Sequence, residues 1–337
     1  MLGFEVIILL STRQNEILKL IIEEYGKVPV PVGSTSICNT LGVSPATVRS
    51  EMAKLEEIGY LEKTHISSGR IPSENGYRYY VDNLMKPKEM TGEEVLNLQK
   101  VFENKSLVLS DAISKSLEII SEMTHYTAIV LGNNNESKLK KVEAIPMNND
   151  SVLAIVITDN GHVENKKIDI EGSDIEEIGK IVELINKLIV GTPISEVSEK
   201  LEFEIKPIIN QYITNHEVIY NAFYSAFKDL RDSSDMTVKG KNNMLEFEEF
   251  SSNAEKIRNL INKFDDDNLV SSIKEDSNGI NVYIGAESNI DDDLTIIKTK
   301  YNANSEEGTL AIIGPKRMEY DKVVSLLEVL KACIERE

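Results

Sequence analysis

Apolar side chains recur at helical spacing shortly after residue 44. Val48, Met52 and Leu55 fall on one stripe, as expected for a helix that packs on one side. Ser44 precedes Pro45, and this pair is typical of an N-cap residue followed by the first helical position. The other side of the predicted helix carries small, polar and basic side chains, namely Ala46, Thr47, Arg49, Ser50 and Lys54.

A second helix and a hairpin flank this segment. The pattern predicts a short helix over residues 34–41, with Gly42 in the turn that follows it. After the helix that begins at Pro45 come a strand-like run over 60–65, a Ser67-Ser68-Gly69 corner and Arg70 on the return. Two helices at a tight turn followed by a hairpin predict a winged helix-turn-helix. Its second helix, with small hydrogen-bonding residues exposed near its start, is shaped to enter a DNA major groove.

The rest of the chain alternates between helical and strand-like patterns. A helix is predicted over 73–85, a linker at Lys86-Pro87-Lys88, and a helical apolar pattern over 93–124. Two strand-rich segments enclose a helical block, so the fold class predicted is α+β and multidomain, with one domain inserted into another. The predicted strands are 126–131, 140–146, 152–158, 162–168, 281–285, 294–301 and 308–314, and the predicted helices between and after them are 175–190, 201–230 and 320–335.

Length and charge limit the interpretation. A chain of 337 residues suggests two or three domains. The net charge is −19, but residues 1–90 hold 10 Lys and Arg against 11 Asp and Glu. Almost all excess acid therefore lies outside the winged-helix segment. Because salt screens charges beyond about 10 Å, a near-neutral reading head on an acidic body remains compatible with DNA binding.

Cysteine usage and the N-terminal residues bear on the compartment. Cys38 and Cys333 are far apart, which argues for a reducing environment, and Cys38 fits a small buried residue between two helices. The apolar run Leu2–Leu10 has only nine residues, which is too short to span a bilayer. It contains Glu5 and lacks a basic flank, so it is unlike a signal peptide. We expect a soluble, cytoplasmic protein.

No pattern indicates an enzyme. The four histidines are scattered, and none pairs with Cys, Asp or Glu at metal or triad spacing. The acidic runs 265–267 and 291–293 lack the alternating ligands of a calcium loop. Gly314-Pro315-Lys316-Arg317 invites an anion-binding interpretation, but a strand-to-helix turn with Arg317 paired inside the domain is favoured. We predict no catalytic residue, no metal and no cofactor.

The candidate residues are therefore those of the winged helix. Arg49 is favoured as a base contact over an ion pair with Glu56, and Arg70 is the best phosphate or minor-groove candidate in the wing. For Arg78 and His65, a DNA contact and a purely structural role are equally consistent with the pattern. The predicted DNA-binding set is Ser44, Ala46, Thr47, Arg49, Ser50, Lys54, His65, Ser67, Ser68, Gly69, Arg70 and Arg78. Tyr77, Tyr79 and Tyr80 fit a core stripe better than a base-stacking set.

Several strings resemble the HrcA family of heat-inducible transcription repressors. The resemblance covers the chain from about Thr12 to about Leu330 and is weakest in the middle third. Three positions depart from the family pattern: Ser50 stands where asparagine is usual, Thr64 where proline is usual, and Ser73 where threonine is usual. The strings are Val32–Ser34, Ser44–Arg49, Leu55–Leu61, His65–Pro72, Gly76–Asp82, Val282–Ser288 and Ile312–Tyr320.

The resemblance implies a domain order and a function. It implies a winged-helix domain at 1–88, a GAF-like domain in two parts at 89–172 and 241–337, and an inserted, mainly helical dimerisation domain at 173–240. The implied function is repression of heat-shock chaperone operons by a homodimer on an inverted-repeat operator in double-stranded DNA. The GroE chaperonin is the implied modulator of activity. Serine at position 50 lacks the bidentate amide that reads adenine, so base preference could differ.

Another class of regulator remains open. The chain could be a metabolite-responsive winged-helix repressor whose effector binds in the GAF-like domain, although no convergent polar pocket can be named from the sequence. A structural nucleoid protein fits less well, because the body is acidic and basic tails are lacking.

Overall fold

The computed structural model divides the chain into two compact units. The first comprises Met1–Val130, Thr237–Tyr301 and Thr309–Glu337, and the second comprises Leu131–Met236 and Asn302–Gly308. The structure describes residues 10–63, 69–107, 109–132, 137–148, 151–159, 161, 163–169, 175–208, 220–221, 223–225, 227, 236–264, 267–274, 279–303 and 306–336, without the side chains of 267, 268, 271, 274 and 306.

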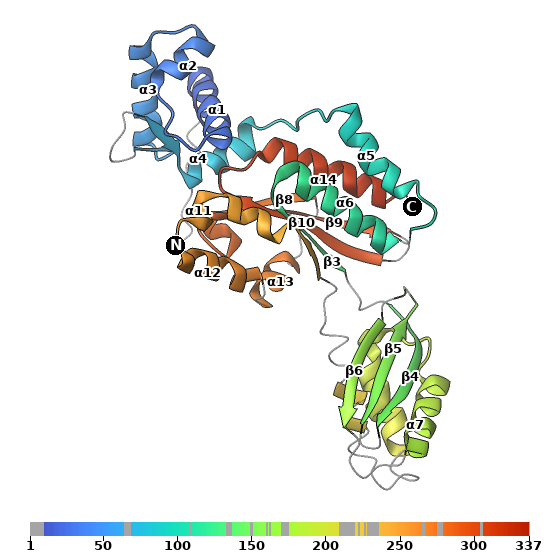
Figure 1. Cartoon of the computed structure of the whole chain (residues 1–337). Helices are drawn as coiled ribbons and strands as arrows, with labels where there is room; N and C mark the ends of the chain where they lie inside the picture. Colours follow the sequence, from blue (N-terminus) through green and yellow to red (C-terminus); the bar gives the residue numbers. More distant parts are fainter. Residues whose placement is uncertain are drawn as a thin grey trace. The chain divides into compact units, whose positions relative to one another are not determined.

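The N-terminal part of the first unit, residues 10–85, is called the head here. It contains α1 (Thr12–Lys27), α2 (Ser34–Leu41), α3 (Pro45–Glu57), β1 (Leu61–Lys63), β2 (Arg70–Pro72) and α4 (Glu74–Tyr79), shown in blue in Figure 1. A capping box starts α1, because the Ser11 hydroxyl accepts from the Gln14 N–H while the Gln14 side chain accepts from the Ser11 N–H. The fully buried core of the head includes Ile17, Leu18, Ile21, Ile37, Val48 and Leu55. The winged helix-turn-helix prediction is confirmed.

The predicted helix over 73–85 is also present. Ser73 caps α4, and the chain continues through one π-helical turn, η1 (Tyr80–Leu84), before residues 85–91 leave regular structure. The side chains of Tyr77, Tyr79 and Tyr80 are buried. This confirms that they form a core stripe, which leaves no free ring face for a nucleobase.

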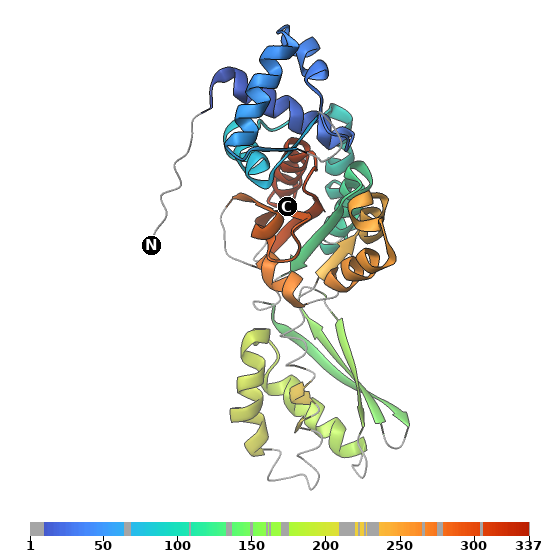
Figure 2. The same ribbon diagram turned by 90° about the vertical axis from the view of Figure 1, so that its left-hand side faces the viewer.

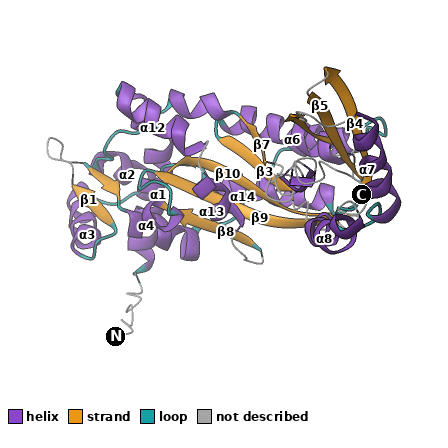
Figure 3. Ribbon diagram, turned by 90° about the horizontal axis from the view of Figure 1, so that it is seen from below, coloured by secondary structure: helices purple, strands orange, loops and turns teal. Residues whose placement is uncertain are grey.

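The remainder of the first unit, called the body here, is built on a five-stranded sheet. Its order is β7-β3-β10-β9-β8, with β8 and β9 antiparallel from Ile280↔Thr299 to Ile284↔Thr295. The strands are β3 (Thr127–Gly132), β7 (Met236–Lys239), β8 (Ile280–Ile284), β9 (Leu294–Ala303) and β10 (Glu306–Pro315). Strands β8, β9 and β10 are neighbours both in the chain and in the sheet, whereas β3 and β7 join the sheet from distant segments. The strands are orange in Figure 3.

Helices cover both faces of this sheet. The Thr295 hydroxyl lies 3.4 Å from that of Tyr320 at the start of α14, whereas Lys298 donates to the Ser272 carbonyl of α13 at 2.6 Å. Because side chains alternate along a strand, α13 and α14 lie on opposite faces. The helical elements are α5 (Gly92–Phe102), α6 (Leu109–Thr124), η3 (Lys241–Glu246), α11 (Glu248–Ser251), α12 (Ala254–Phe264), α13 (Asp267–Lys274), η4 (Gly285–Ser288) and α14 (Tyr320–Ile334).

The second unit has a sheet of its own. Its strands β4 (Leu139–Asn148), β5 (Ser151–Thr158) and β6 (Val163–Asp169) are antiparallel in that order, which confirms the strands predicted over 140–146, 152–158 and 162–168. Helices α7 (Ile175–Leu188) and α8 (Ile194–Lys200) with the π-turn η2 (Leu201–Ile205) cover one face of it (Figure 2). The core between them includes Val142, Val156, Ile181 and Ile185.

The structure places the border between the two units differently from the sequence analysis. The strands over 139–169 belong with α7 in the second unit, whereas the sequence analysis placed them before residue 173 in the other domain. The inserted unit therefore contains a sheet as well as helices. Helices α12 and α13 and strand β7 had not been predicted. The predicted helix over 201–230 is helical to residue 208, beyond which 209–219 lie outside the described residues.

Candidate DNA-binding surface

The start of α3 is fixed by its cap. The Ser44 hydroxyl accepts from the Thr47 N–H at 3.2 Å and lies 2.9 Å from the Thr47 hydroxyl, and Pro45 occupies the first helical turn. The Gly42 N–H bonds to the Cys38 carbonyl, and Gly42 has a φ of 65°. The turn prediction is thus confirmed. The capped N-terminus of α3 carries the positive end of the helix dipole, which favours phosphate.

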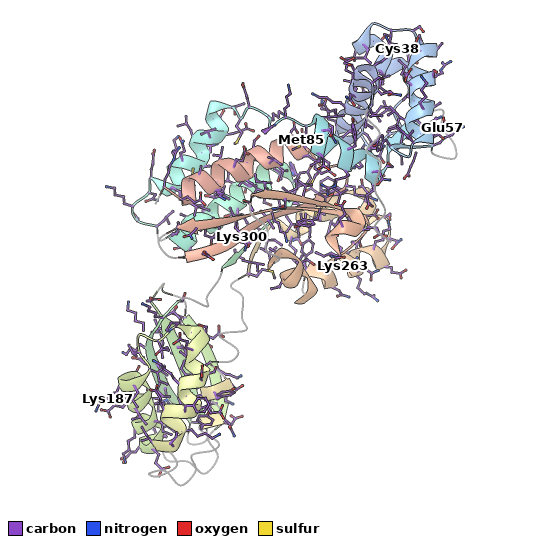
Figure 4. The ribbon with its side chains drawn as sticks, turned by 180° about the vertical axis from the view of Figure 1, so that it is seen from behind. Cys38, Glu57, Met85, Lys187, Lys263 and Lys300 are labelled. Carbon is purple, nitrogen blue, oxygen red and sulfur yellow. The ribbon has the colours of Figure 1, made fainter. Side chains whose placement is uncertain are left out.

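One side of α3 is buried and the other is open. Val48, Met52 and Leu55 are buried against α1 and α2. Ala46, Arg49, Ser50 and Lys54 are exposed, and Thr47 is half-buried. The predicted reading face therefore lies at the surface of the head. Figure 4 labels Cys38 on α2 and Glu57 at the end of α3, which locate the two helices of this surface.

The two cations on this face have weak intramolecular partners. The Arg49 Nε donates to the Ser34 hydroxyl at 3.2 Å, which orients the guanidinium and leaves the rest of it exposed. The Lys54 ammonium lies 2.9 Å from the Glu51 carboxylate, with 55% of the Lys54 side chain exposed. Exposed pairs of this kind contribute about 0–1 kcal/mol, so a phosphate could replace the glutamate at little cost.

The wing is a two-stranded hairpin. Strands β1 and β2 pair from Leu61↔Pro72 to Lys63↔Arg70, and Arg70 also bridges to Val32. The tip, residues 64–68, is outside the described residues, so the predicted contacts His65, Ser67 and Ser68 cannot be placed. Gly69 is buried, and a Cβ at this position would lie 2.7 Å from the Pro31 carbonyl oxygen. Glycine at this position permits a close backbone approach and offers no exposed surface to DNA.

Arg70 fastens the wing to α3. Its Nε and one terminal nitrogen lie 2.7 and 2.6 Å from a Glu56 carboxylate oxygen, and another nitrogen donates to the Gly69 carbonyl. Only 15% of the Arg70 side chain is exposed. The sequence analysis placed Arg70 among the DNA contacts and considered Glu56 as a partner for Arg49. The structure instead pairs Glu56 with Arg70, which leaves Arg49 on the open face.

Arg78 lies away from the reading face. Its guanidinium forms an ion pair with Glu287 of η4 and donates to the Val282 carbonyl at 2.6 Å and to Asp82 at 3.3 Å. Burial opposes its charge, but the hydrogen bonds from Arg78 to Glu287 and Asp82 and the charges of those carboxylates raise the pKa of Arg78 overall. The sequence left Arg78 open between DNA and structure. Its partners assign it to the contact between head and body.

The structure adds a residue that sequence reasoning missed. Lys63 ends β1 and is exposed, and it has no ion pair among the described residues. Its position at the base of the wing makes it a phosphate candidate. Its place at the end of a short strand next to the Ser-Ser-Gly corner was the available signal. The surface called the reading face below consists of Ser44, Ala46, Thr47, Arg49, Ser50, Lys54 and Lys63.

Metal sites, anion sites and membrane-spanning helices are the other features to consider in the described part of the chain. Its His, Cys, Asp and Glu side chains form no group of three that could hold a metal ion. Arg317 pairs with Glu249 and donates to the Gly26 carbonyl, which confirms pairing inside the first unit over the anion-binding interpretation. Among the described helices, none is both long and apolar enough to cross a membrane.

Comparison with known proteins identifies both parts of the chain. Residues 9–80 match the family model described as "Winged helix-turn-helix transcription repressor, HrcA DNA-binding", and residues 110–324 match "HrcA protein C terminal domain". A protein of Bacillus pumilus (strain SAFR-032) named heat-inducible transcription repressor HrcA is 37% identical over 95% of both chains. A protein of the same name from Lysinibacillus sphaericus is 35% identical over 96% of both chains.

A solved structure supports the fold. The crystal structure of a hypothetical protein superposes with a TM-score of 0.58 at 23% identity and covers 97% of both chains. At that identity the likeness concerns the fold alone. The relatives are transcription repressors, which agrees with the prediction that this chain is not an enzyme.

Proposed function

Because this chain belongs to the HrcA family of transcription repressors, we propose that it represses chaperone operons by binding an inverted-repeat operator as a homodimer. Each copy would place α3 in the major groove of one half-site, and the bound dimer would block RNA polymerase at the promoter. The observation that supports this most directly is the open face of α3. Small and hydrogen-bonding side chains are exposed next to a capped helix N-terminus.

The roles proposed for the reading face follow from side-chain chemistry. Arg49 carries the bidentate donors that suit guanine O6 and N7, and Ser50 can donate or accept at a base edge. Lys54 and Lys63 are placed for phosphate contacts, which orient the protein without reading sequence. Since the head is nearly neutral, we expect modest non-specific affinity and a shallow salt dependence.

An exposed sheet face supports the homodimer. The side of the β4-β5-β6 sheet away from its core carries apolar residues on all three strands, interspersed with Lys141, Glu143, Asn165 and Lys167. Ile145 and Val163 are 46% and 52% exposed at the edges of this face. A second copy can cover such a face by a two-fold axis, and the same symmetry matches an inverted repeat. The surface called the outer sheet face below consists of Ile145, Leu153, Ile155, Ile157 and Val163.

A footprint on the promoter of the organism's own chaperone operon tests the proposal. Arg49→Ala should weaken operator protection by roughly 5- to 150-fold, the equivalent of 1–3 kcal/mol for a lost base contact. Arg258→Ala, at an exposed arginine of α12 in the body, is the matched control and should leave protection unchanged. Urea unfolding of both variants checks that neither has lost its structure. We expect Arg49→Ala to remain folded, because the hydrogen bond that it removes, from Arg49 to Ser34, is only partly buried. Equal protection by wild type and Arg49→Ala would place the reading surface elsewhere.

The proposal includes control by the GroE chaperonin, which the family resemblance implies. If the native head and body need chaperonin to form, heat would divert chaperonin to other unfolded clients and leave the repressor inactive. A change of about 1–2 kcal/mol in the stability of a marginal protein alters the active population several-fold. Operator binding should be measured after heating and cooling with and without chaperonin. Complete recovery without chaperonin would remove this part of the proposal.

A further inference from the structure

The head contacts the body through three of its own elements. All three lie within the first compact unit, so the contacts belong to one folded structure. Two of the body segments involved are the strings near the C-terminus that resemble the family, Val282–Ser288 and Ile312–Tyr320. The residues of this head–body junction are Gly26, Glu74, Tyr77, Arg78 and Tyr80 of the head and Gly285, Glu287, Arg317 and Tyr320 of the body.

The first contact joins α4 to η4. The Arg78 guanidinium meets both oxygens of the Glu287 carboxylate and also donates to the Val282 carbonyl. Glu287 is itself held in place, because it accepts from the Ile284 N–H at 3.0 Å. A bidentate arginine–carboxylate pair fixes the relative orientation of the two groups as well as the distance between them. Both ends of this contact are therefore set by backbone groups of the body.

Gly285 allows α4 to come this close. Its φ is +54°, and a Cβ there would clash with the Glu74 carboxylate and lie 3.0 Å from the Asp292 carbonyl oxygen. Only glycine combines that backbone conformation with that approach. The side chain of Glu74, in the first turn of α4, thus lies directly against the backbone of the body.

The second and third contacts involve α1 and the buried tyrosines. Arg317 donates to the Gly26 carbonyl in the last turn of α1, while its other nitrogens pair with Glu249. Only 12% of the Arg317 side chain is exposed. Tyr320 is buried, and its ring centroid lies 5.8 Å from that of Tyr77 and 6.4 Å from that of Tyr80. Contacts from α1, α4 and η1 together leave the head little freedom to rotate on the body.

We propose that Glu287 is a positioning residue for operator binding, assisted by Arg317: it sets the orientation of α3 so that two heads of one dimer meet half-sites at a fixed spacing. The inference rests on the proposed function, since it needs a dimer on an inverted repeat. Neither residue touches DNA. Each acts through the backbone or side chains of α1 and α4.

The physical effect is on the second half-site. Once one head is bound, the other binds as an intramolecular partner, with an effective concentration that depends on how well its position is fixed. A rigid junction removes rotation of the head on the body, so affinity depends more steeply on spacing than it would with a loose junction. A loosened junction spreads the second head over many positions, which lowers affinity for the correct spacing and tolerates incorrect ones.

The test compares full operators, spacer variants and an isolated half-site. Glu287→Gln removes the ion pair and retains an amide oxygen for the Ile284 N–H. Its half-site affinity should stay within about twofold of wild type, while affinity for the full operator falls about tenfold. Lengthening the spacer by 2 base pairs should cost this variant less than it costs wild type. Glu328→Gln, an equal charge change at an exposed residue of α14, should match wild type on every duplex.

Arg78→Gln removes the same pair from the other side. It should reproduce the Glu287→Gln pattern, and a loss of half-site affinity in Arg78→Gln alone would assign Arg78 to phosphate and overturn the inference. An unchanged ratio of full-operator to half-site affinity in Glu287→Gln would also overturn it. If wild type itself showed no preference for the full operator or for its spacing, the proposed function would fail instead.

Discussion

Replacing Ile155 by lysine should separate the proposed dimer into monomers. Ile155 is at the centre of the outer sheet face, opposite Glu143 on β4 and Asn165 on β6. In the monomer the new ammonium remains in water and lies next to the Glu143 carboxylate, so the second unit should remain folded. In a dimer it would be buried between two copies of the outer sheet face, next to Leu153 and Ile157.

The cost can be worked from the symmetry of the interface. Full burial of an isoleucine contributes about 1.5–3 kcal/mol, but Ile155 is already partly buried in the monomer, so dimerisation gains roughly half of that. A two-fold interface uses each residue twice. A loss of about 1 kcal/mol per copy thus becomes about 2 kcal/mol per dimer, or roughly thirtyfold in the dissociation constant. Desolvation of the ammonium adds to this figure.

Sedimentation equilibrium from nanomolar to micromolar protein measures the shift. Leu188→Lys introduces the same side chain at the end of α7, where Leu188 is 37% exposed, and should leave association unchanged. A dimer that survives Ile155→Lys but dissociates with Leu188→Lys would place the interface on the helical side and refute the reasoning. Circular dichroism of both variants confirms that the monomers are folded.

Two further predictions concern stability. Ser73→Ala should lower the unfolding free energy by about 1–2 kcal/mol in urea titrations. The reason is that the buried Ser73 hydroxyl donates to the Gly59 carbonyl at 2.6 Å and accepts from the Gly76 N–H at 3.0 Å. Ser73→Thr keeps the hydroxyl and should lose much less stability, and equal losses in the two variants would contradict a capping role. Burial raises the pKa of Tyr126 to about 12, so its contribution to stability is complete below pH 10 and disappears as the pH rises through 12. Wild type should therefore lose up to about 3 kcal/mol more than Tyr126→Phe between pH 10 and 12, and parallel stability profiles would refute this.

Local patterns were sufficient for the head. The stripe Val48, Met52 and Leu55 and the cap at Ser44 depend on residues within one helix, so periodicity alone predicted which side of α3 is exposed. The strand-like runs over 152–158 and 162–168 likewise predicted β5 and β6. These elements are specified by neighbours in sequence, and the structure confirms them.

Long-range pairing could not be predicted in the same way. The residues next to Arg70 and Arg78 do not reveal the partners of these two arginines, because the partners, Glu56 and Glu287, are 14 and 209 residues away. The border near residue 131 was missed for a related reason: β3 joins a sheet completed by C-terminal strands, while β4, the next strand along, pairs with β5. A strand pattern does not reveal the partner of that strand.

The position of β3 between β7 and β10 has a consequence for how the chain is made. Residues 133–305 leave the ribosome after β3 and before β10 begins, which takes roughly 10–35 s at ordinary rates of translation. Throughout that interval β3 lacks β10, and only β7 of its two neighbours is made before the interval ends, so the sheet of the body cannot close. An incomplete sheet leaves a strand edge unpaired, so we expect the nascent chain to be more prone to aggregation than the finished protein.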